Sequence, residues 1–208
     1  MPDLRTTYLG LPLAHPVVAS ASPLSHDLDG IRRLEDGGAS AIVLFSLFEE
    51  QIERENATIA TLTAAGAEST AEAASYFPAG GDFAAGPGAY FDLVRRARNA
   101  VGVPVIASLN GVTDTGWVEY AQLMHEAGAS AIELNLFHIP ADPLASGRDV
   151  EQRYEETVAA VCRAVPIPVA VKLSPFFSAT GEMARRFVAA GARGLVLFNR
   201  FYQPDFDL

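Results

Sequence analysis

The stretch Ala129–Pro140, ASAIELNLFHIP, starts as a buried strand and ends in polar residues. Its apolar residues form the nearly continuous run of a strand covered on both faces; they are Ala131, Ile132, Leu134 and Leu136. Glu133 and Asn135 interrupt the run two residues apart, so a strand places both side chains on one face. A carboxylate and an amide in an apolar interior cost free energy unless they have partners. We therefore expect a functional site at the end of this strand.

Outward from this stretch, two types of segment alternate along the chain. The first is a proline that leads into an apolar, β-branched run, and it occurs as Pro16–Ser22, Pro104–Asn110 and Pro168–Ser174. The second is a Gly-Ala pair that leads directly into an apolar run, and it occurs as Gly38–Ser46, Gly128–Leu136 and Gly191–Asn199. From each proline to the following alanine the offsets are 23, 25 and 24 residues. The spacing predicts three βαβ units.

Helical patterns fill the intervals within the units and between them, and those within the units end at glycine, as helices often do. Within the units they span Leu28–Asp36, Trp117–Ala127 and Glu182–Ala190, and between the units Tyr90–Ala100 and Val150–Ala164. Six parallel strands with intervening helices fit an open doubly wound sheet or most of an eight-stranded barrel. The barrel is favoured because one unit recurs and because no Gly-x-Gly-x-x-Gly follows the first strand.

We therefore predict an α/β fold, a TIM (β/α)8-type barrel with about six of its eight β/α units in this chain. The fourth βαβ unit is expected to be missing, since such barrels typically have ~250 residues and this chain has 208. Residues 1–208 then form one incomplete barrel domain. Thr6–Pro16 is expected to form a short hairpin ahead of the first strand.

The periodic pattern weakens between Gln51 and Gly88, where Ala, Thr, Glu and Gly dominate. We expect residues 62–88 to form a loop insertion over the barrel mouth, because long loops after barrel strands often cover active sites. A solvent-exposed loop without a function fits the same composition, and both interpretations stay open.

The composition argues against several classes of function. The formal net charge of −10 disfavours nucleic acid and anionic membranes as partners. No apolar run approaches the roughly 20 residues of a membrane helix, and no signal-peptide pattern is expected at the N-terminus. Cys162 is the only cysteine; we expect it in the core of the protein, in a reducing, cytoplasmic location. No metal site is predicted.

Polar residues recur at matching positions near the C-terminal ends of the predicted strands. In the three proline-led strands they are Ser20, Ser108 and Lys172, followed two residues later by Ser22, Asn110 and Ser174. The C-terminal ends of parallel barrel strands meet at one mouth, where active sites are built. The agreement of three strands, together with Asn135 and Asn199 on the others, indicates a site for a small molecule.

Lys172 is the only lysine of the chain and lies within an apolar strand. An ammonium group at such a position needs an anion as partner or a lowered pKa. One interpretation is a bound anionic ligand, and the other is a structural ion pair with Glu133 on the neighbouring strand. His138, just beyond a strand end, is similarly either an acid or base or a polar surface residue.

Five short segments, in this order and spacing, resemble the class 1 dihydroorotate dehydrogenases, specifically the divergent dihydroorotate dehydrogenase-like group. They are Pro16–Ser22, Pro104–Gly111, Ile132–Asn135, Val171–Leu173 and Leu197–Asp205. The resemblance implies an FMN-binding (β/α)8 barrel of the cytoplasm that acts in pyrimidine biosynthesis. It also implies hydride transfer from a small, dihydropyrimidine-like substrate to the flavin, and it allows a homodimer.

The resemblance assigns roles by position. The cofactor-binding residues are Ser20, Ala21, Ser22, Asn110, Asn135 and Lys172. Of these, Lys172 matches the lysine near flavin N1 and the C2 carbonyl, where a cation stabilises the anionic reduced flavin. The substrate-binding residues are Asn135 and Asn199, and His138 stands at the position of the catalytic base, which is Cys or Ser in the family.

The chain also departs from the family pattern. The lysine expected after the second strand is absent from Val43–Phe48, and Tyr76–Phe83 replaces an asparagine-rich substrate segment. His138–Pro140 stands where the family has Cys-Pro-Asn. Two hypotheses follow: the full-length protein is an FMN-dependent oxidoreductase, or the chain is a non-catalytic or truncated barrel homologue that binds a ligand or a partner.

Overall fold

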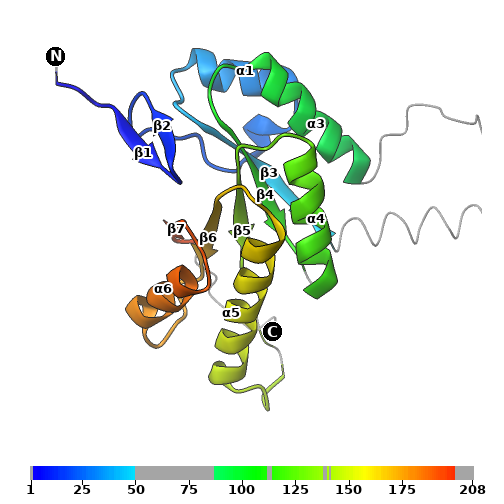
Figure 1. The fold of residues 1–208 in the computed structure, drawn as a ribbon, viewed down its shortest axis with the longest axis vertical. Helices are drawn as coiled ribbons and strands as arrows, with labels where there is room; N and C mark the ends of the chain where they lie inside the picture. The colour runs from blue at the N-terminus through cyan, green and yellow to red at the C-terminus, as the bar shows by residue number, and fades with distance from the viewer. Residues whose placement is uncertain (1, 50–86, 112–113, 138–139, 141, 200–208) are drawn as a thin grey trace, which may run out of the picture.

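The computed structural model describes residues 2–49, 87–111, 114–137, 140 and 142–199 (Figure 1). Residues 62–86 of the predicted loop insertion lie outside these ranges, and its last two residues begin a helix. The described helices are η1 (Pro23–Ser25), α1 (Leu28–Asp36), α3 (Pro87–Ala100), α4 (Asp114–Glu126), α5 (Gly147–Ala164) and α6 (Thr180–Ala189). No helix among these residues is long and apolar enough to cross a membrane.

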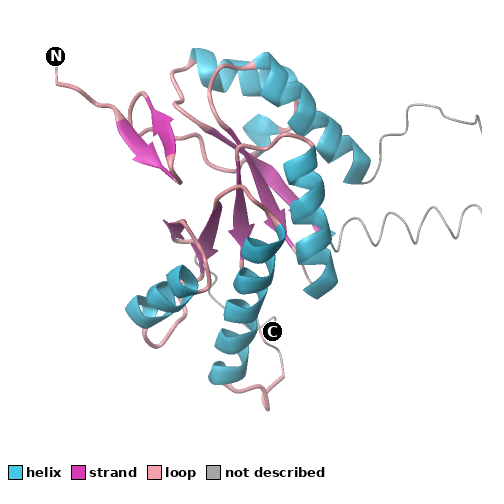
Figure 2. Ribbon diagram, viewed as in Figure 1, coloured by secondary structure: helices cyan, strands magenta, loops and turns pink. Residues whose placement is uncertain are grey.

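Five parallel strands form one sheet in chain order: β3 (Ile42–Phe48), β4 (Val105–Asn110), β5 (Ala131–Asn135), β6 (Val169–Leu173) and β7 (Gly194–Leu197). A helix connects each strand to the next. Ahead of the sheet, β1 (Thr6–Tyr8) and β2 (Leu11–Leu13) pair as an antiparallel hairpin, as predicted for Thr6–Pro16. Figure 2 shows the helices around the outside of the sheet and the hairpin beside it.

The prediction of six regular strands is wrong in one place. Pro16–Ser22 forms a single bridge, between Ala19 and Ile42, instead of a strand. The Ala19 N–H donates to the Ala41 carbonyl at 3.0 Å, but Pro23 starts η1 four residues later and ends the extended backbone, because proline fixes φ. The described sheet is open, with β3 and β7 at its two ends, so neither closure nor six units is confirmed.

The predicted helices are all present, and the glycines after three of them, α1, α4 and α6, explain where those helices end. Gly38, Gly128 and Gly191 have φ of 91°, 95° and 116°, the left-handed conformation that ends a helix and that glycine adopts without a steric penalty. Gly191 also lies against Cys162: a Cβ at this glycine would be 2.9 Å from the Cβ of Cys162. Cys162 is half-buried, at the edge of the core.

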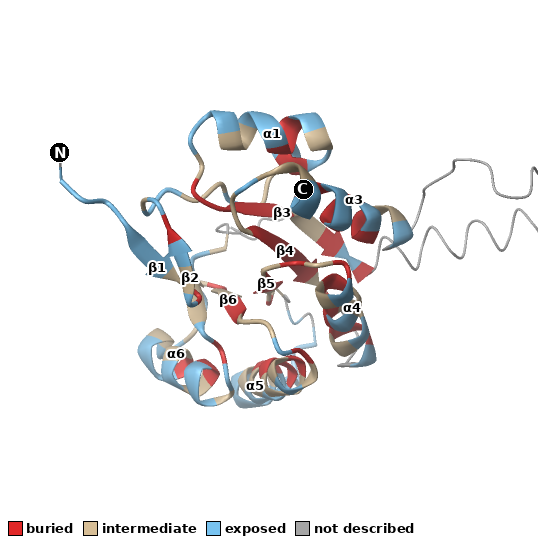
Figure 3. Cartoon of the chain, turned by 45° about the horizontal axis from the view of Figure 1, so that its top comes forward, coloured by how far each residue is buried: buried red, intermediate tan, exposed pale blue. Residues whose placement is uncertain are grey.

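The apolar core has two layers, one on each face of the sheet (Figure 3). The outer layer joins the strands to the helices and includes the fully buried Phe187 of α6. The inner layer joins two hairpin residues, Leu9 and Leu13, to alternate residues of the parallel strands. These strand residues are Val43, Ile106, Ala131 and Ala170. Gly194 makes room for the hairpin, since a Cβ there would be 2.5 Å from Cδ2 of Leu9. The inner layer therefore closes the N-terminal end of the inner face.

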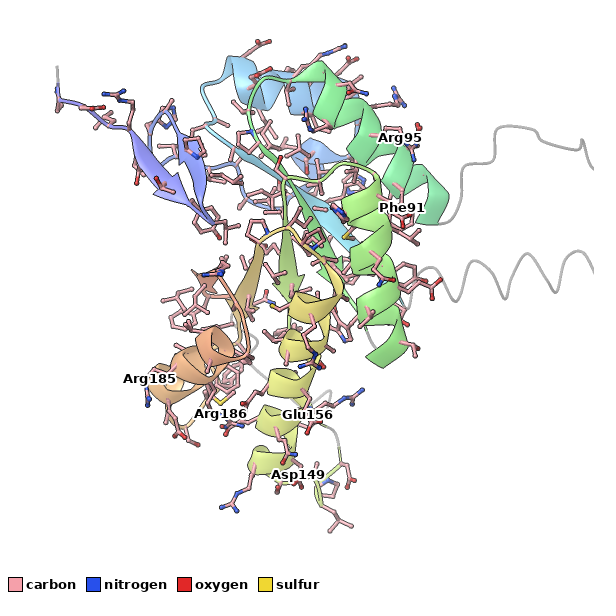
Figure 4. All side chains as sticks on the ribbon, in the orientation of Figure 1. Phe91, Arg95, Asp149, Glu156, Arg185 and Arg186 are labelled. Carbon is pink, nitrogen blue, oxygen red and sulfur yellow. The ribbon has the colours of Figure 1, made fainter. Side chains whose placement is uncertain are left out.

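Arg186 connects α6 to α5 (Figure 4). Its Nε donates to Oε2 of Glu155 at 2.8 Å, and its Nη1 lies 3.3 Å from Oε2 of Glu151. The carboxylates raise the pKa of the Arg186 guanidinium, and the hydrogen bond with Glu155 is the main cause. Partly exposed ion pairs of this kind typically contribute about 0–1 kcal/mol each, so they fix the helix pair without dominating stability.

Gly30 permits a close approach between α1 and η1, and we expect Gly30→Ala to lower the free energy of unfolding by about 1–3 kcal/mol. A Cβ at this position would be 2.1 Å from the backbone carbonyl oxygen of Leu24, which cannot move without displacing η1. Urea denaturation measures the change. Gly181→Ala near the start of α6 is the matched control, because a Cβ there meets nothing within 4 Å. Equal effects of the two substitutions would show that the approach does not constrain the fold.

Candidate functional site

Polar residues from four strands and from the segment after β7 lie together on the inner face, beyond the apolar layer that the hairpin covers. We call Ser46, Ser108, Glu133, Asn135, Lys172 and Asn199 the inner polar band. The strand register places Ser46 beside Ser108, Ser108 beside Glu133, and Asn135 beside Lys172. Because strand residues alternate between faces, the same register that turns Ala131 and Ala170 inward also turns Glu133, Asn135 and Lys172 inward.

Three side-chain contacts connect the band. Oγ of Ser46 and Oγ of Ser108 are 2.8 Å apart. Nζ of Lys172 is 2.5 Å from Oε1 of Glu133, and only 14% and 4% of these two side chains are exposed. The Asn199 amide nitrogen donates to Oδ1 of Asn135.

The segment after β7 is held by its backbone as well. The Asn199 N–H donates to the Leu173 carbonyl at 2.8 Å, so the amide of Asn199 is fixed over the ends of β5 and β6. Residues that are 64 positions apart in the sequence, Asn135 and Asn199, therefore present one joined pair of amides. Amides both donate and accept hydrogen bonds, which suits recognition of a small polar ligand.

A bulge in β3 explains how Tyr90 reaches the band. The register with β4 shifts between Val43 and Ser46, which leaves backbone groups of Ser108 without a strand partner. The Tyr90 hydroxyl takes their place: it accepts from the Ser108 N–H at 2.9 Å and donates to the Ser108 carbonyl at 3.2 Å. Burial raises the pKa of Tyr90, and the charge of Glu133 raises it further, so this hydroxyl stays protonated near neutral pH.

Glu133 dominates the electrostatics of the inner face. Its Oε1 is buried and makes no hydrogen bond with the residues that the structure describes; its contact with Lys172 is an ion pair without hydrogen-bond geometry. The charge also reaches the hairpin, where burial and, secondarily, Glu133 raise the pKa of Tyr8 to about 12. Glu133 is therefore a buried anion with one close cationic partner among the described residues.

The predicted site residues fall into four groups, the last of which is the segment from Ser20 to Ser22. Asn135, Lys172 and Asn199 belong to the band, and the ion pair with Glu133 that was one interpretation of Lys172 is present. Asn110, half-buried, ends β4 opposite Phe48. His138 lies outside the described residues, so its role as base stays a prediction.

The segment expected beneath the flavin is only partly inward. Ala21 packs against the inner apolar layer, whereas Ser20 is exposed. The Ser22 carbonyl accepts from the N–H and the hydroxyl of Ser25, at 3.2 and 2.9 Å. The hydroxyl groups of Ser20 and Ser22 are not part of the inner polar band.

Two residues of the site were not predicted, Ser46 and Tyr90. Ser46 interrupts the apolar run of β3, as Glu133 interrupts β5, and that interruption was a usable signal. The bulge breaks the alternation between faces, however. The spacing of residues in the sequence therefore could not show which face of the sheet Ser46 lies on. Nothing in the sequence around Tyr90 indicates that its hydroxyl reaches a strand.

Comparison with curated proteins gives a consistent set of relatives, although no family model matches the chain. A protein of Aeropyrum pernix whose name assigns it to dihydroorotate dehydrogenase A (fumarate) is 38% identical over 108 residues, covering 51% of this chain and 35% of that protein. The catalytic subunit of dihydroorotate dehydrogenase B (NAD(+)) of Endomicrobium trichonymphae is 27% identical, covering 100% of this chain and 65% of that subunit.

The chain resembles the dihydroorotate dehydrogenases. This confirms the resemblance found in the sequence. The subunit PreA of the NAD-dependent dihydropyrimidine dehydrogenase of Escherichia coli K12 is also similar, at 27% identity over 95% of this chain and 48% of the subunit. The matched stretches thus span between about a third and two thirds of these dihydroorotate and dihydropyrimidine dehydrogenases.

Solved structures with a similar fold are TIM-barrel enzymes. A phosphonopyruvate hydrolase in complex with oxalate and Mg++ has a TM-score of 0.55 at 17% identity, over 89% of this chain and 59% of that chain. A second structure of phosphonopyruvate hydrolase gives 0.54 at 16% identity. At this identity the likeness concerns the fold alone. The α/β architecture with a parallel sheet is TIM-like.

Proposed function

We propose that this chain contributes to an FMN-dependent oxidoreductase that takes hydride from a small, dihydropyrimidine-like substrate. The relatives named as dehydrogenases of dihydroorotate and dihydropyrimidines support the reaction class. The single observation that carries the proposal to this chain is the position of Lys172. The only lysine of the sequence lies on the inner face beside Asn135, which Asn199 joins.

The groups of the band suit a flavin ring, which offers carbonyl oxygens and ring nitrogens along one edge. Lys172 provides an ammonium donor for a carbonyl oxygen or a developing negative charge. The side-chain oxygen of Asn135 accepts a hydrogen bond from the amide nitrogen of Asn199. The side-chain nitrogen of Asn135 therefore points away from Asn199 and would donate to a ligand. Asn110 stands at the end of the neighbouring strand and can donate to the ring edge. When bound, the flavin supplies the hydride acceptor.

The remaining roles concern the substrate and its proton. Asn135 and Asn199 would orient a substrate whose carbonyl and N–H groups match their amides. His138 would accept the proton, since histidine titrates near neutral pH. The location of His138 shortly after Asn135 in the chain supports this role.

Reduction of the flavin by candidate substrates tests the proposed reaction. Dihydroorotate or dihydrouracil is added to the FMN-loaded chain without oxygen, and loss of the oxidised flavin absorption is followed. We expect one of them to reduce the flavin, and His138→Gln to slow that reduction by at least about 100-fold, the usual contribution of a general base. His125→Gln in α4 is the matched control and should leave the rate unchanged. Retained FMN that neither compound reduces would contradict the substrate class.

A further inference from the structure

We infer that Glu133 is a positioning residue for Lys172: it holds the ammonium group at the inner face and offsets its charge, so that a bound flavin faces an ion pair instead of a lone cation. The inference rests on the proposed function for its redox consequence, but the part that concerns Lys172 itself stands on the described residues alone. Nothing in the family resemblance assigned a role to Glu133.

The geometry favours this role over a purely structural one. Nζ of Lys172 meets Oε1 of Glu133 at 2.5 Å, although the register sets Lys172 opposite Asn135 and Glu133 opposite Ala170. The ion pair is therefore diagonal, between residues one level apart on neighbouring strands. The direct neighbour of Lys172 is an uncharged amide, so the attraction to the Glu133 carboxylate is what holds the ammonium group at this position.

The energetics also suggest a function for the pair. Two buried charges lose hydration, and apolar residues of similar volume are often as stabilising as a buried ion pair. Oε1 of Glu133, the oxygen that Lys172 contacts, makes no hydrogen bond with the described residues. A buried carboxylate oxygen without a well-formed hydrogen bond costs stability, so a pair kept solely for stability would be expected to satisfy it. The buried ion pair therefore contributes little to the stability of a core. It suits a site in which the charge next to a ligand affects how the ligand reacts.

The two charges act in opposite directions on a bound flavin. Lys172 stabilises negative charge that develops on reduction, and Glu133 destabilises it. Removing Glu133 should raise the midpoint potential of the flavin, and removing Lys172 should lower it. Removing both leaves no net change in charge and should return the potential close to that of the wild type.

Labelling of Lys172 tests the inference without any cofactor. Because the chain has a single lysine, an amine-specific reagent followed by peptide mass spectrometry reports on Lys172 alone, apart from the N-terminus. We expect Glu133→Gln to label at least about tenfold faster, since the ammonium no longer has to leave a buried carboxylate before it reacts. Glu151→Gln is the matched control, because its ion pair with Arg186 is elsewhere. Equal rates in Glu133→Gln and the wild type would overturn the inference.

If Glu133→Gln does not fold, the labelling rate of Lys172 is measured in Glu133→Asp instead. It keeps the charge but withdraws the carboxylate by one methylene, so the ion pair is stretched. An intermediate labelling rate supports the inference, and a wild-type rate contradicts it.

The potential of bound FMN gives the second readout. We expect the preference for reduced over oxidised FMN to rise about tenfold in Glu133→Gln, or about 30 mV for a two-electron couple, and to fall in Lys172→Met. Shifts of the same sign in both variants would overturn the inference, because loss of structure has no reason to separate the signs. If the chain retains no FMN, the proposed function fails, while the labelling result still decides the inference about Glu133.

Discussion

Lys172→Met is expected to lower the free energy of unfolding by about 3–5 kcal/mol, the usual cost of removing one partner from a buried ion pair. The side chain of Glu133 is 4% exposed and Lys172 is its close cationic partner among the described residues. Methionine fills a similar volume, so the loss comes from the unpaired carboxylate and not from a cavity. Denaturation by urea, followed by circular dichroism, measures the change.

Two further variants separate this cause from others. Glu133→Gln/Lys172→Met removes both charges and should recover most of the lost stability. Arg186→Met removes two partly exposed ion pairs, with Glu151 and Glu155, and should cost no more than about 2 kcal/mol. A loss below about 1 kcal/mol in Lys172→Met would mean that Glu133 is not a buried anion in need of a partner.

Phe187→Ala is expected to cost about 3–5 kcal/mol, as deletions of large buried side chains do. Phe187 is fully buried between α6 and the sheet, and its ring meets that of Phe177 edge to face with centroids 6.2 Å apart. The neighbouring Val188 is 56% exposed, so Val188→Ala is the matched control and should change stability by no more than about 0.5 kcal/mol. Similar losses in thermal denaturation would contradict the placement of the α6 core face.

Much of the fold was predictable because local signals agreed with one another. Gly38, Gly128 and Gly191 end helices in the left-handed conformation that their position after helical patterns predicted. Pro16–Ser22 was the exception: its pattern matches the other strands, but Pro23 turns the chain into η1 before a ladder can extend. A strand needs partners along its length, and that requirement is not visible in its own residues.

The sequence predicted which residues of the site share a face of the sheet. It did not predict which of their side chains contact one another. Alternation placed Glu133 and Asn135 on one face of their strand, and the matching positions of the proline-led strands grouped Lys172 with the other polar residues. The choice between a ligand and Glu133 as partner of Lys172 needed the distance between the two side chains. The contribution of Tyr90 depends on the bulge in β3, a feature of how two strands pair. Bulges arise from tertiary packing and leave little trace in the pattern of one strand.

Retention of FMN decides whether the inner polar band is part of a flavin site. The purified chain is incubated with FMN and desalted, and its visible absorption spectrum is recorded. We expect a flavin absorption band that stays with the protein and is shifted from that of free FMN. Asn135→Ala should weaken FMN binding about tenfold, the value of a lost hydrogen bond in a buried site. Asn99→Ala, on the exposed face of α3, should bind as the wild type does. A folded protein that loses all flavin on desalting would contradict a cofactor site at the inner polar band and favour the non-catalytic barrel.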